Sequence, residues 1–475
     1  MRSARIAPWL VMLATLSVVA TACGPGASAS PRRSAEGSAA ASAPSGEAVE
    51  IRWYCCLGAG DAPEQVEVEN AVVEAFNASH PNIHLTLEVV PYDAAYDTLA
   101  TQIGAGNPPD IVGPLGIGGA NAFPGQWLDL TEQIEATGYD LSQFPENTVE
   151  IYQLGEEGQV GIPFAIYPSA LWYKKSHFEE AQLNEPPHVW GDPYVMPDGT
   201  EVEWNYDTVR EIAMLLTVDE NNNDATSPDF DPDNVVQWGF EPQRDDMRQV
   251  GAYWEAGRLV SDDGTTAQIP DSWAAAWTWW YAGMWEDHFS MTGAQFESTD
   301  LNPEGYPFFT GNVSMSQNYL WSKYGVSGAG DDWDLAASPS YQGNITAAFN
   351  ADTFRIMKDT EHPAEAFEVL TYLLGEASGD LLNTYGGMPA RPEEQDAYFA
   401  TISEDFTQEV DWQVIIDGAQ YADNPNFESP MPAYNEALTV LDTFGTRWQT
   451  EAGLDLEQEF EDLRAQLQEV FDAAQ

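Results

Sequence analysis

The chain has few basic residues and few cysteines. Lys and Arg together number 17 against 77 Asp and Glu, which gives a formal net charge of −60 at pH 7 over 475 residues. Such a charge makes nucleic acids and anionic lipid surfaces poor partners. The acidic residues are scattered, which is typical of a solvated surface. Because only four residues are Lys, adaptation to high salt is a second interpretation.

Several motifs of catalysis and of metal or cofactor binding are also absent. The sequence contains no G-x-x-x-x-G-K-[ST] phosphate loop, no G-x-S-x-G nucleophile elbow, no H-E-x-x-H and no C-x-x-C. Its 6 His are scattered without the spacing of metal ligands. We therefore expect no organic cofactor.

Long apolar segments are missing except near the start. Arg2 and Arg5 precede an apolar or small run from Ile6 to Ala22, which predicts an export signal over 1–22. Cys23 follows in "VVATAC", which resembles a bacterial lipobox, whose cysteine becomes the acylated first residue. An ordinary signal peptide that happens to contain a cysteine is the alternative. The Gly-, Ala-, Ser- and Pro-rich residues up to 48 then predict a flexible tether over 23–48.

The next part alternates strand and helix patterns. Val49, Ile51 and Trp53 alternate with polar residues, as in a strand with one buried face. Asp61, Pro63 and Glu64 resemble the capping box of a following helix. The predicted order continues with a strand over 83–89, a helix over 94–103 and a strand at 111–112. This order predicts a parallel α/β sheet, in which ligands bind beyond the carboxyl ends of the strands. The loops 55–61 and 113–119 occupy such places.

Five stretches, in order, resemble the extracellular sugar-binding proteins of bacterial ABC importers, the group that includes maltose-binding protein. They are "YDTLATQIGAGNPPDIV" (96–112), "GIPFAIYPSALWYKKSHFEEA" (161–181), "FFTGNVSMSQNYLW" (308–321), "HPAEAFEVLTYLL" (362–374) and "GGMPARPE" (386–393). The resemblance covers nearly everything after the tether.

This resemblance implies a periplasmic-binding-protein-like fold, in which two α/β lobes close on a ligand around a hinge of several crossings. Lobe one is then expected over 49–166 plus 346–390, and lobe two over 167–345 plus 391–475. The crossings are expected near 164–167, 346–350 and 388–391. The resemblance also implies a monomer on the outer face of the cell membrane, attached to the membrane only by its lipid. Such a protein binds a sugar, catalyses no reaction and delivers the sugar to ABC permease subunits.

Candidate sugar contacts follow from the resemblance and from chemistry, because sugars stack on aromatic rings and need placed polar groups. Each has a structural alternative. The alternative for Tyr167 is packing at the hinge, and for Trp321 or Trp254 it is a place in the core. The alternative for Arg391 is an ion pair between the lobes, and for Asn350 it is a strand cap. The remaining predicted contacts are Glu255, Gly58, Asp61 and Leu115, together with Cys55 and Cys56. In the aromatic cluster over 273–285, Trp273, Trp277, Tyr281 and Trp285 recur every four residues on one helix face, which favours core over a sugar platform.

The adjacent pair Cys55 and Cys56 has two possible states. Export places it outside the reducing cytosol. Adjacent Cα atoms lie ~3.8 Å apart, below the ~4.4–6.8 Å usual for a disulfide, so a bond between them closes a strained ring of the kind found at binding sites. A disulfide and two buried thiols both remain open. Our hypothesis is that the disulfide forms a flat apolar wall against which the sugar packs.

An acidic loop, "DENNNDATSPDFDPDN" (219–234), resembles the first half of an EF-hand calcium loop. Its predicted ligands are Asp219, Asn221 and Asn223, the carbonyl of Ala225, and Asp229 or Asp231. Asp224 stands where Gly is usual, and Phe230 stands where the closing Glu is expected. A structural calcium ion is the prediction, and a turn-rich surface loop is the alternative.

Two other functions remain open. With 77 acidic residues, the sequence does not exclude the paired carboxylates of a secreted glycoside hydrolase. A surface adhesin is expected to contain repeats, and we find none.

Overall fold

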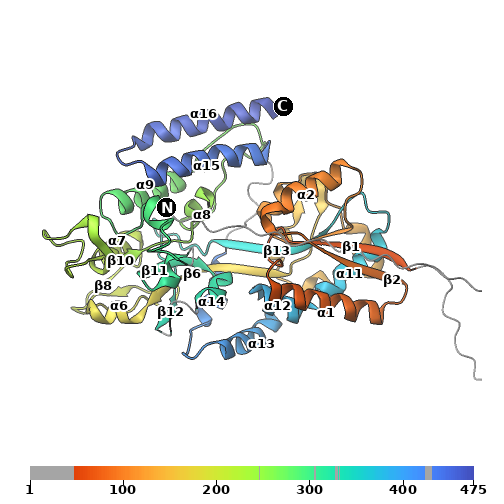
Figure 1. Ribbon diagram of the computed structural model, residues 1–475, viewed down its shortest axis with the longest axis horizontal. Helices are drawn as coiled ribbons and strands as arrows, with labels where there is room; N and C mark the ends of the chain where they lie inside the picture. Colours follow the sequence, from red (N-terminus) through yellow and green to blue (C-terminus); the bar gives the residue numbers. More distant parts are fainter. Residues whose placement is uncertain are drawn as a thin grey trace, which may run out of the picture. The chain divides into compact units, whose positions relative to one another are not determined.

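One ten-stranded β-sheet organises the protein. The computed structural model describes residues 48–474, apart from 245, 304–305, 327–329, 331 and 423–430 and the side chains at 156 and 324. The predicted signal, Cys23 and tether before residue 48 lie outside these residues. The main path of the sheet runs β2-β1-β3-β13-β6-β11-β10-β9, with β12 and β14 also paired to β6 (Figure 1).

The first part of the sheet confirms the predicted strand and helix order. It contains β1 (Val49–Cys55), β2 (Ile83–Val89) and β3 (Ile111–Leu115), with β1 parallel to both others. Ile51 and Trp53 are fully buried, as the alternation predicts. Helix α1 (Pro63–Ser79) follows β1, and α2 (Tyr92–Gly104) follows β2.

The capping prediction for α1 was wrong by one residue. Ala62 is the N-cap, and Gln65 supplies the side chain: its Oε1 accepts from the backbone N–H of Ala62 at 3.4 Å and of Gly60 at 2.8 Å. The Asp61 carboxylate instead accepts from the backbone N–H of Tyr92 at 3.0 Å, at the start of α2. Spacing alone did not show that a second helix begins beside Asp61.

The second part of the sheet contains β6 (Ala165–Lys174), β9 (Val218–Asp219), β10 (Val235–Phe240), β11 (Val313–Tyr319) and β12 (Trp333–Ala336). Strand β11 runs parallel to β10 and antiparallel to β6. All residues of β6 and β11 are buried. These strands are therefore covered on both faces, which explains their lack of a clear alternation in sequence.

Two long strands connect the two parts. The first four residues of β6 pair with β13 (Phe349–Ile356), and its later residues pair with β11. In β13 the first four residues pair with β6, and the later ones pair with β3. Strand β14 (Met388–Pro389) also pairs with the start of β6. The three segments that the resemblance names as crossings thus lie side by side, with β6 and β13 in the middle of the sheet (Figure 1). The lobe boundaries themselves stay a prediction.

The remaining elements are helices, two short hairpins and 3₁₀ turns. The helices are α3 (Ile117–Asn121), α4 (Thr131–Thr137), α5 (Glu146–Glu150), α6 (Lys175–Glu180), α7 (Tyr206–Leu216), α8 (Met247–Ala252), α9 (Asp271–Trp285), α10 (Gly293–Phe296), α11 (Pro363–Leu373), α12 (Ser378–Tyr385), α13 (Pro392–Ile402), α14 (Gln413–Gly418), α15 (Tyr434–Thr450) and α16 (Leu456–Ala474). Two short hairpins are β4 (Gln153–Leu154) with β5 (Gly158–Gln159) and β7 (Tyr194–Val195) with β8 (Glu201–Val202). Short 3₁₀ turns include η1 (Leu141–Gln143) and η5 (Leu320–Tyr324).

The tryptophans of α9 confirm the core prediction. Trp273, Trp277 and Trp280 are at most 1 % exposed. The indole N–H of Trp273 donates to the backbone oxygen of Glu255, and that of Trp277 donates to Met247. Three buried rings, two of them with paired N–H groups, make α9 a packing helix rather than a sugar platform. Among the described residues, no helix combines the length and apolar character that a membrane crossing requires.

Candidate functional site

The carboxyl ends of β1 and β3 meet beside the crossing strand β13. Leu57, after β1, forms a bridge with Leu115 at the end of β3. A Cβ added to Gly58 meets the backbone oxygen of Pro114 at 3.1 Å and the carboxylate of Asp352 at 3.6 Å. Two predicted contacts, Gly58 and Leu115, are therefore brought together, and a glycine is needed because the loop lies so close to β3.

Strand β13 presents two polar residues at alternate positions. Asn350 and Asp352 are half-buried, whereas Phe349, Ala351 and Thr353 are buried. Since side chains alternate across a strand, the two polar groups share one face. Asn350 was predicted from the sequence, but Asp352 was missed. The same alternation, applied to the predicted crossing, is the signal that identifies it.

Asp352 is placed as a hydrogen-bonding carboxyl group beside both loops. Its Oδ1 lies 3.0 Å from a Cβ added at Gly116, and its Oδ2 lies near Gly58. Burial raises the pKa of Asp352 to about 7, and a hydrogen bond from Tyr167 acts against that rise. Near neutral pH the group is therefore present in both protonation states, so it can accept from a ligand hydroxyl or donate to one.

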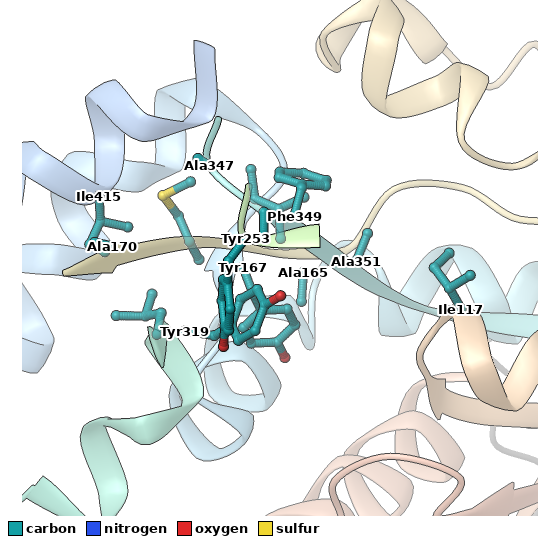
Figure 2. Close-up of a cluster of buried hydrophobic side chains, with 14 of the residues drawn as sticks. Ile117, Ala165, Tyr167, Ala170, Tyr253, Tyr319, Ala347, Phe349, Ala351 and Ile415 are labelled. Atoms are coloured by element: carbon teal, nitrogen blue, oxygen red, sulfur yellow. The ribbon is translucent and has the colours of Figure 1, made fainter. Parts of the chain in front are cut away.

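Aromatic rings continue from Tyr167 into the second part of the sheet. Tyr167 lies directly opposite Asn350 in the strand pairing. Its ring contacts Trp321 edge-on at a centroid distance of 5.1 Å, and Trp321 stacks on Tyr319 at 4.3 Å. Figure 2 shows the rings of Tyr167, Tyr253 and Tyr319 close together on one side of the crossing strands. Two predicted contacts, Tyr167 and Trp321, thus come together next to Asn350 and Asp352.

Trp321 is held in a defined orientation. Its indole N–H donates to the side-chain oxygen of Gln243 at 2.9 Å. The indole is half-buried, and the stack with Tyr319 covers one of its faces. A ring fixed on one face and at its N–H is suited to stacking a sugar on the other face.

Trp254 lies in a separate aromatic stack. Tyr206 packs on it at a centroid distance of 4.4 Å and Tyr341 at 4.5 Å. Trp254 is 5 % exposed, so most of its indole is packed against other rings of the protein. Glu255 lies on the same side of the molecule, where its charge helps to raise the pKa of Tyr341 after the larger effect of burial. A hollow of about 560 Å³ is lined by Trp254 and Tyr341 together with Glu203 and Asp207, but not by Tyr167 or Trp321.

Arg391, predicted as a sugar contact, has its guanidinium bonded to protein partners. Nε donates to the Gln143 side chain at 2.6 Å, and Nη1 donates to the backbone oxygen of Leu374 at 2.6 Å. Nη2 donates to the hydroxyl of Tyr139 at 3.2 Å, and the group lies over Phe144. The side chain is directed toward η1 and the end of α11 and has no nitrogen without a protein acceptor. These bonds favour a packing role for Arg391, and its contact with a ligand stays a prediction.

The cysteine pair is placed at the end of β1 as predicted, but inside the protein. The sulfurs of Cys55 and Cys56 lie 2.07 Å apart, a bonding separation, and both side chains have no solvent exposure. Asp61, at the other end of the loop, is exposed and bonds the start of α2. The pair is therefore fully buried in this structure, and its role as a sugar wall stays a hypothesis.

The acidic loop is closed by hydrogen bonds to one residue. The buried carboxylate of Asp219 accepts from the backbone N–H groups of Asn221, Asn223 and Asp231 and from the Asn223 amide. Burial acts to raise the pKa of Asp219, but these bonds outweigh it and lower the pKa to about 2. Asp231 instead bonds the backbone of Asp233. In the described part of the chain, the carboxylates of the predicted set form no group close enough to share an ion.

Solved structures similar to this chain share its fold. An ABC substrate-binding protein of Listeria monocytogenes in complex with cycloalternan is 18 % identical, with a TM-score of 0.68 over 90 % of this chain and 100 % of that one. The sugar-binding protein MalE of Xanthomonas citri is 14 % identical, with a TM-score of 0.67 over 90 % of this chain and 98 % of that one. The fold is therefore periplasmic-binding-protein-like, with two α/β lobes around a hinge of several crossings.

The family follows from the sequence comparison. The family model described as bacterial extracellular solute-binding protein matches residues 61–380, more than half of the chain. The chain belongs to this family. Proteins of Brucella abortus and Brucella suis that are named as binding proteins are 32 % identical over 128 residues. That match spans 26 % of this chain and 29 % of each relative, so the functions of the whole relatives are not carried over.

Proposed function

We propose that this protein is the lipid-anchored sugar receptor of an ABC importer. A mono- or oligosaccharide binds at the crossing strands, closure of the lobes is stabilised by contacts from both, and the closed form delivers the sugar to the permease. It acts as a monomer and does no chemistry. Family membership supports the receptor role, and the signal and Cys23 support the anchor.

The observation that supports a sugar as the ligand is the succession of the side chains of Asp352, Tyr167 and Trp321. A carboxyl group that both donates and accepts, a phenol bonded to it and a half-buried indole 5.1 Å from that phenol lie in succession. Sugars require this combination, because their rings have apolar faces and their edges carry hydroxyl groups. Asn350, opposite Tyr167, adds an amide.

Known receptors of this fold support the same ligand class. The Listeria structure contains cycloalternan, and an Arthrobacter globiformis protein with a TM-score of 0.64 is named for binding cyclic α-maltosyl-1,6-maltose. We infer a carbohydrate from this combination of fold and local chemistry. A secreted glycoside hydrolase is the alternative from sequence, and it is not favoured because the matching family consists of binding proteins.

A saccharide panel tests the proposal. The protein is incubated with mono- and oligosaccharides, its melting temperature is measured, and each sugar is then analysed for cleavage. We expect a rise in melting temperature with at least one sugar that stays intact. Cleaved sugar indicates the hydrolase, and no response across a broad panel contradicts sugar binding.

The anchor has a separate test. Expressed in a bacterium with its signal, the wild-type chain is expected in the membrane fraction, and Cys23→Ala is expected in the soluble exported fraction. A chain that is equally soluble with and without Cys23 contradicts lipidation.

A further inference from the structure

Glu69, on the buried side of α1, has too few hydrogen-bond donors around it to stabilise an ionised carboxylate. It has no solvent exposure. Its Oε1 accepts from the hydroxyl of Tyr385 at 2.6 Å and lies 3.4 Å from Sγ of Cys55. Its Oε2 is buried without a hydrogen-bond partner among the described residues. Among the described residues, no cationic side chain forms an ion pair with it.

The surroundings fit tightly around these groups. Gly60 has φ +122°, and a Cβ placed there lies 2.2 Å from Sγ of Cys55 and 2.6 Å from Oε1 of Glu69. Only a glycine leaves room for the carboxyl group to reach the cysteine pair. The contact between Glu69 and the pair is therefore built into the loop.

Glu69 and Gln65 form a clamp one turn apart on α1. The Gln65 amide accepts from the N–H of Gly60 and donates to the backbone oxygen of Thr384 at 3.1 Å. Glu69 likewise contacts the loop at Cys55 and bonds Tyr385. Both side chains thus connect the cysteine loop to the end of α12. Strand β14, the third crossing, begins three residues after Tyr385.

A hydrogen bond between Oε1 of Glu69 and Sγ of Cys55 requires a proton on one of these two atoms. Two bonded sulfurs carry no hydrogen and can only accept a weak hydrogen bond. A carboxylate oxygen also only accepts, so an ionised Glu69 opposite a disulfide pairs two acceptors. A protonated carboxyl group removes this conflict, because its hydroxyl oxygen accepts from Tyr385 and donates to Sγ.

We propose that Glu69 is a positioning residue that works as a neutral carboxylic acid, accepting from Tyr385 and donating its proton to the bonded sulfur of Cys55. The cysteine pair is thereby fixed to α12 and, through α12, to the third crossing. Only the effect of this contact on sugar binding rests on the proposed function. The proton and the contact do not depend on it.

The electrostatics of the site support a neutral group. Burial raises the pKa of Glu69 to about 8, the Tyr385 bond acts against the rise, and the charge of Asp61 adds to it. Burying an ionised carboxylate without a cation is far more costly than burying the acid. The groups that face Glu69 are Asp61 in the loop, Tyr385 on α12 and the two cysteines, and none supplies positive charge.

A direct experiment uses the infrared band of a protonated carboxyl group in the full chain, after thiol counting has confirmed the bonded pair. We expect a band at pH 6 that is missing in Glu69→Gln and that fades as pH rises through about 8. Asp352→Asn is the matched control, because it removes another buried carboxyl group of raised pKa and is expected to leave the Glu69 band intact. Two free thiols at positions 55 and 56, or no band assignable to Glu69, overturn the proposal.

Stability gives a second readout without any sugar. The folded pKa of Glu69 is raised, so the folded state holds the proton more tightly, and stability falls as pH rises from the ordinary value of 4.5 to about 8. Glutamine mimics the neutral acid. We therefore expect the melting temperature of Glu69→Gln to rise progressively relative to that of wild type as pH increases over this range. An equal loss at every pH indicates a structural role only and contradicts the proposal.

Tyr385→Phe is a second variant that keeps Glu69 itself. Because the Tyr385 bond lowers the pKa of Glu69, its removal is expected to shift the midpoint of the infrared titration to higher pH. A midpoint that moves down or does not move overturns the assigned hydrogen bond.

Discussion

Asn350 of β13 lies directly opposite Tyr167 of β6 in an antiparallel pair. The pair joins two strands that each continue into a different part of the sheet, so the polar and aromatic groups converge where the chain crosses. A ligand held there contacts both parts at once. This is the physical condition for a ligand to stabilise one relative arrangement of the lobes.

Trp321 provides the clearest test of the sugar site. Trp321→Leu removes the half-buried ring beside Tyr167, and we expect sugar affinity to fall on the order of tenfold, the value of about one aromatic stacking contact. Calorimetric titration with a sugar found in the panel measures it. Trp285→Leu is the matched control, since that indole is also half-buried but donates to Trp448 in another region. Equal losses in both variants argue against a specific site.

Asp352 predicts a pH dependence of stability. Its folded pKa is raised to about 7 from an ordinary 3.8, so its favourable contribution is complete below that ordinary value and is lost as pH rises through about 7. Asp352→Asn removes this contribution. We expect the difference in melting temperature between variant and wild type to change by a few degrees between pH 4 and pH 8. A difference that is constant over this range contradicts the raised pKa.

Arg391 is predicted to matter for stability and not for sugar. Arg391→Met leaves the acceptors of Gln143, Leu374 and Tyr139 without their donor. We expect a loss of about 3 kcal/mol in the free energy of unfolding, with sugar affinity unchanged. Arg258→Met is the control, because its partner Asp262 is 93 % exposed and such pairs contribute little. Lost affinity at full stability restores Arg391 as a ligand contact.

The calcium prediction for the acidic loop is tested by chelation. If the loop binds calcium, excess chelator lowers the melting temperature and added calcium restores it, and Asp229→Asn weakens the response. The hydrogen bonds to Asp219 offer an account of the loop without an ion. An unchanged melting temperature favours that account.

The formal charge of −60 predicts salt-dependent stability. Like charges on one surface repel, and salt screens them. We expect the melting temperature to rise as sodium chloride is added to dilute buffer. Highest stability in dilute buffer contradicts adaptation to salt.

Local patterns predicted the elements best. The alternation at Ile51 and Trp53 and the proline at 363 gave β1 and α11 correctly, because strand period and helix starts depend on neighbouring residues. The site was predicted in part. Tyr167, Trp321 and Asn350 come together, whereas Arg391 and Trp254 are directed elsewhere by partners that are distant in sequence.

The sequence by itself determined the α/β order and the strongly acidic composition, and its motifs indicated the family, since these depend on composition and short-range spacing. The export signal stays a prediction from the sequence. Only the tertiary structure decided which groups share a site. It placed Asp352 between two loops, packed Trp254 against Tyr206 and Tyr341, and set Glu69 against Cys55. The reason is physical: burial and hydrogen-bond partners are fixed by contacts between segments far apart in the chain, which no local pattern records.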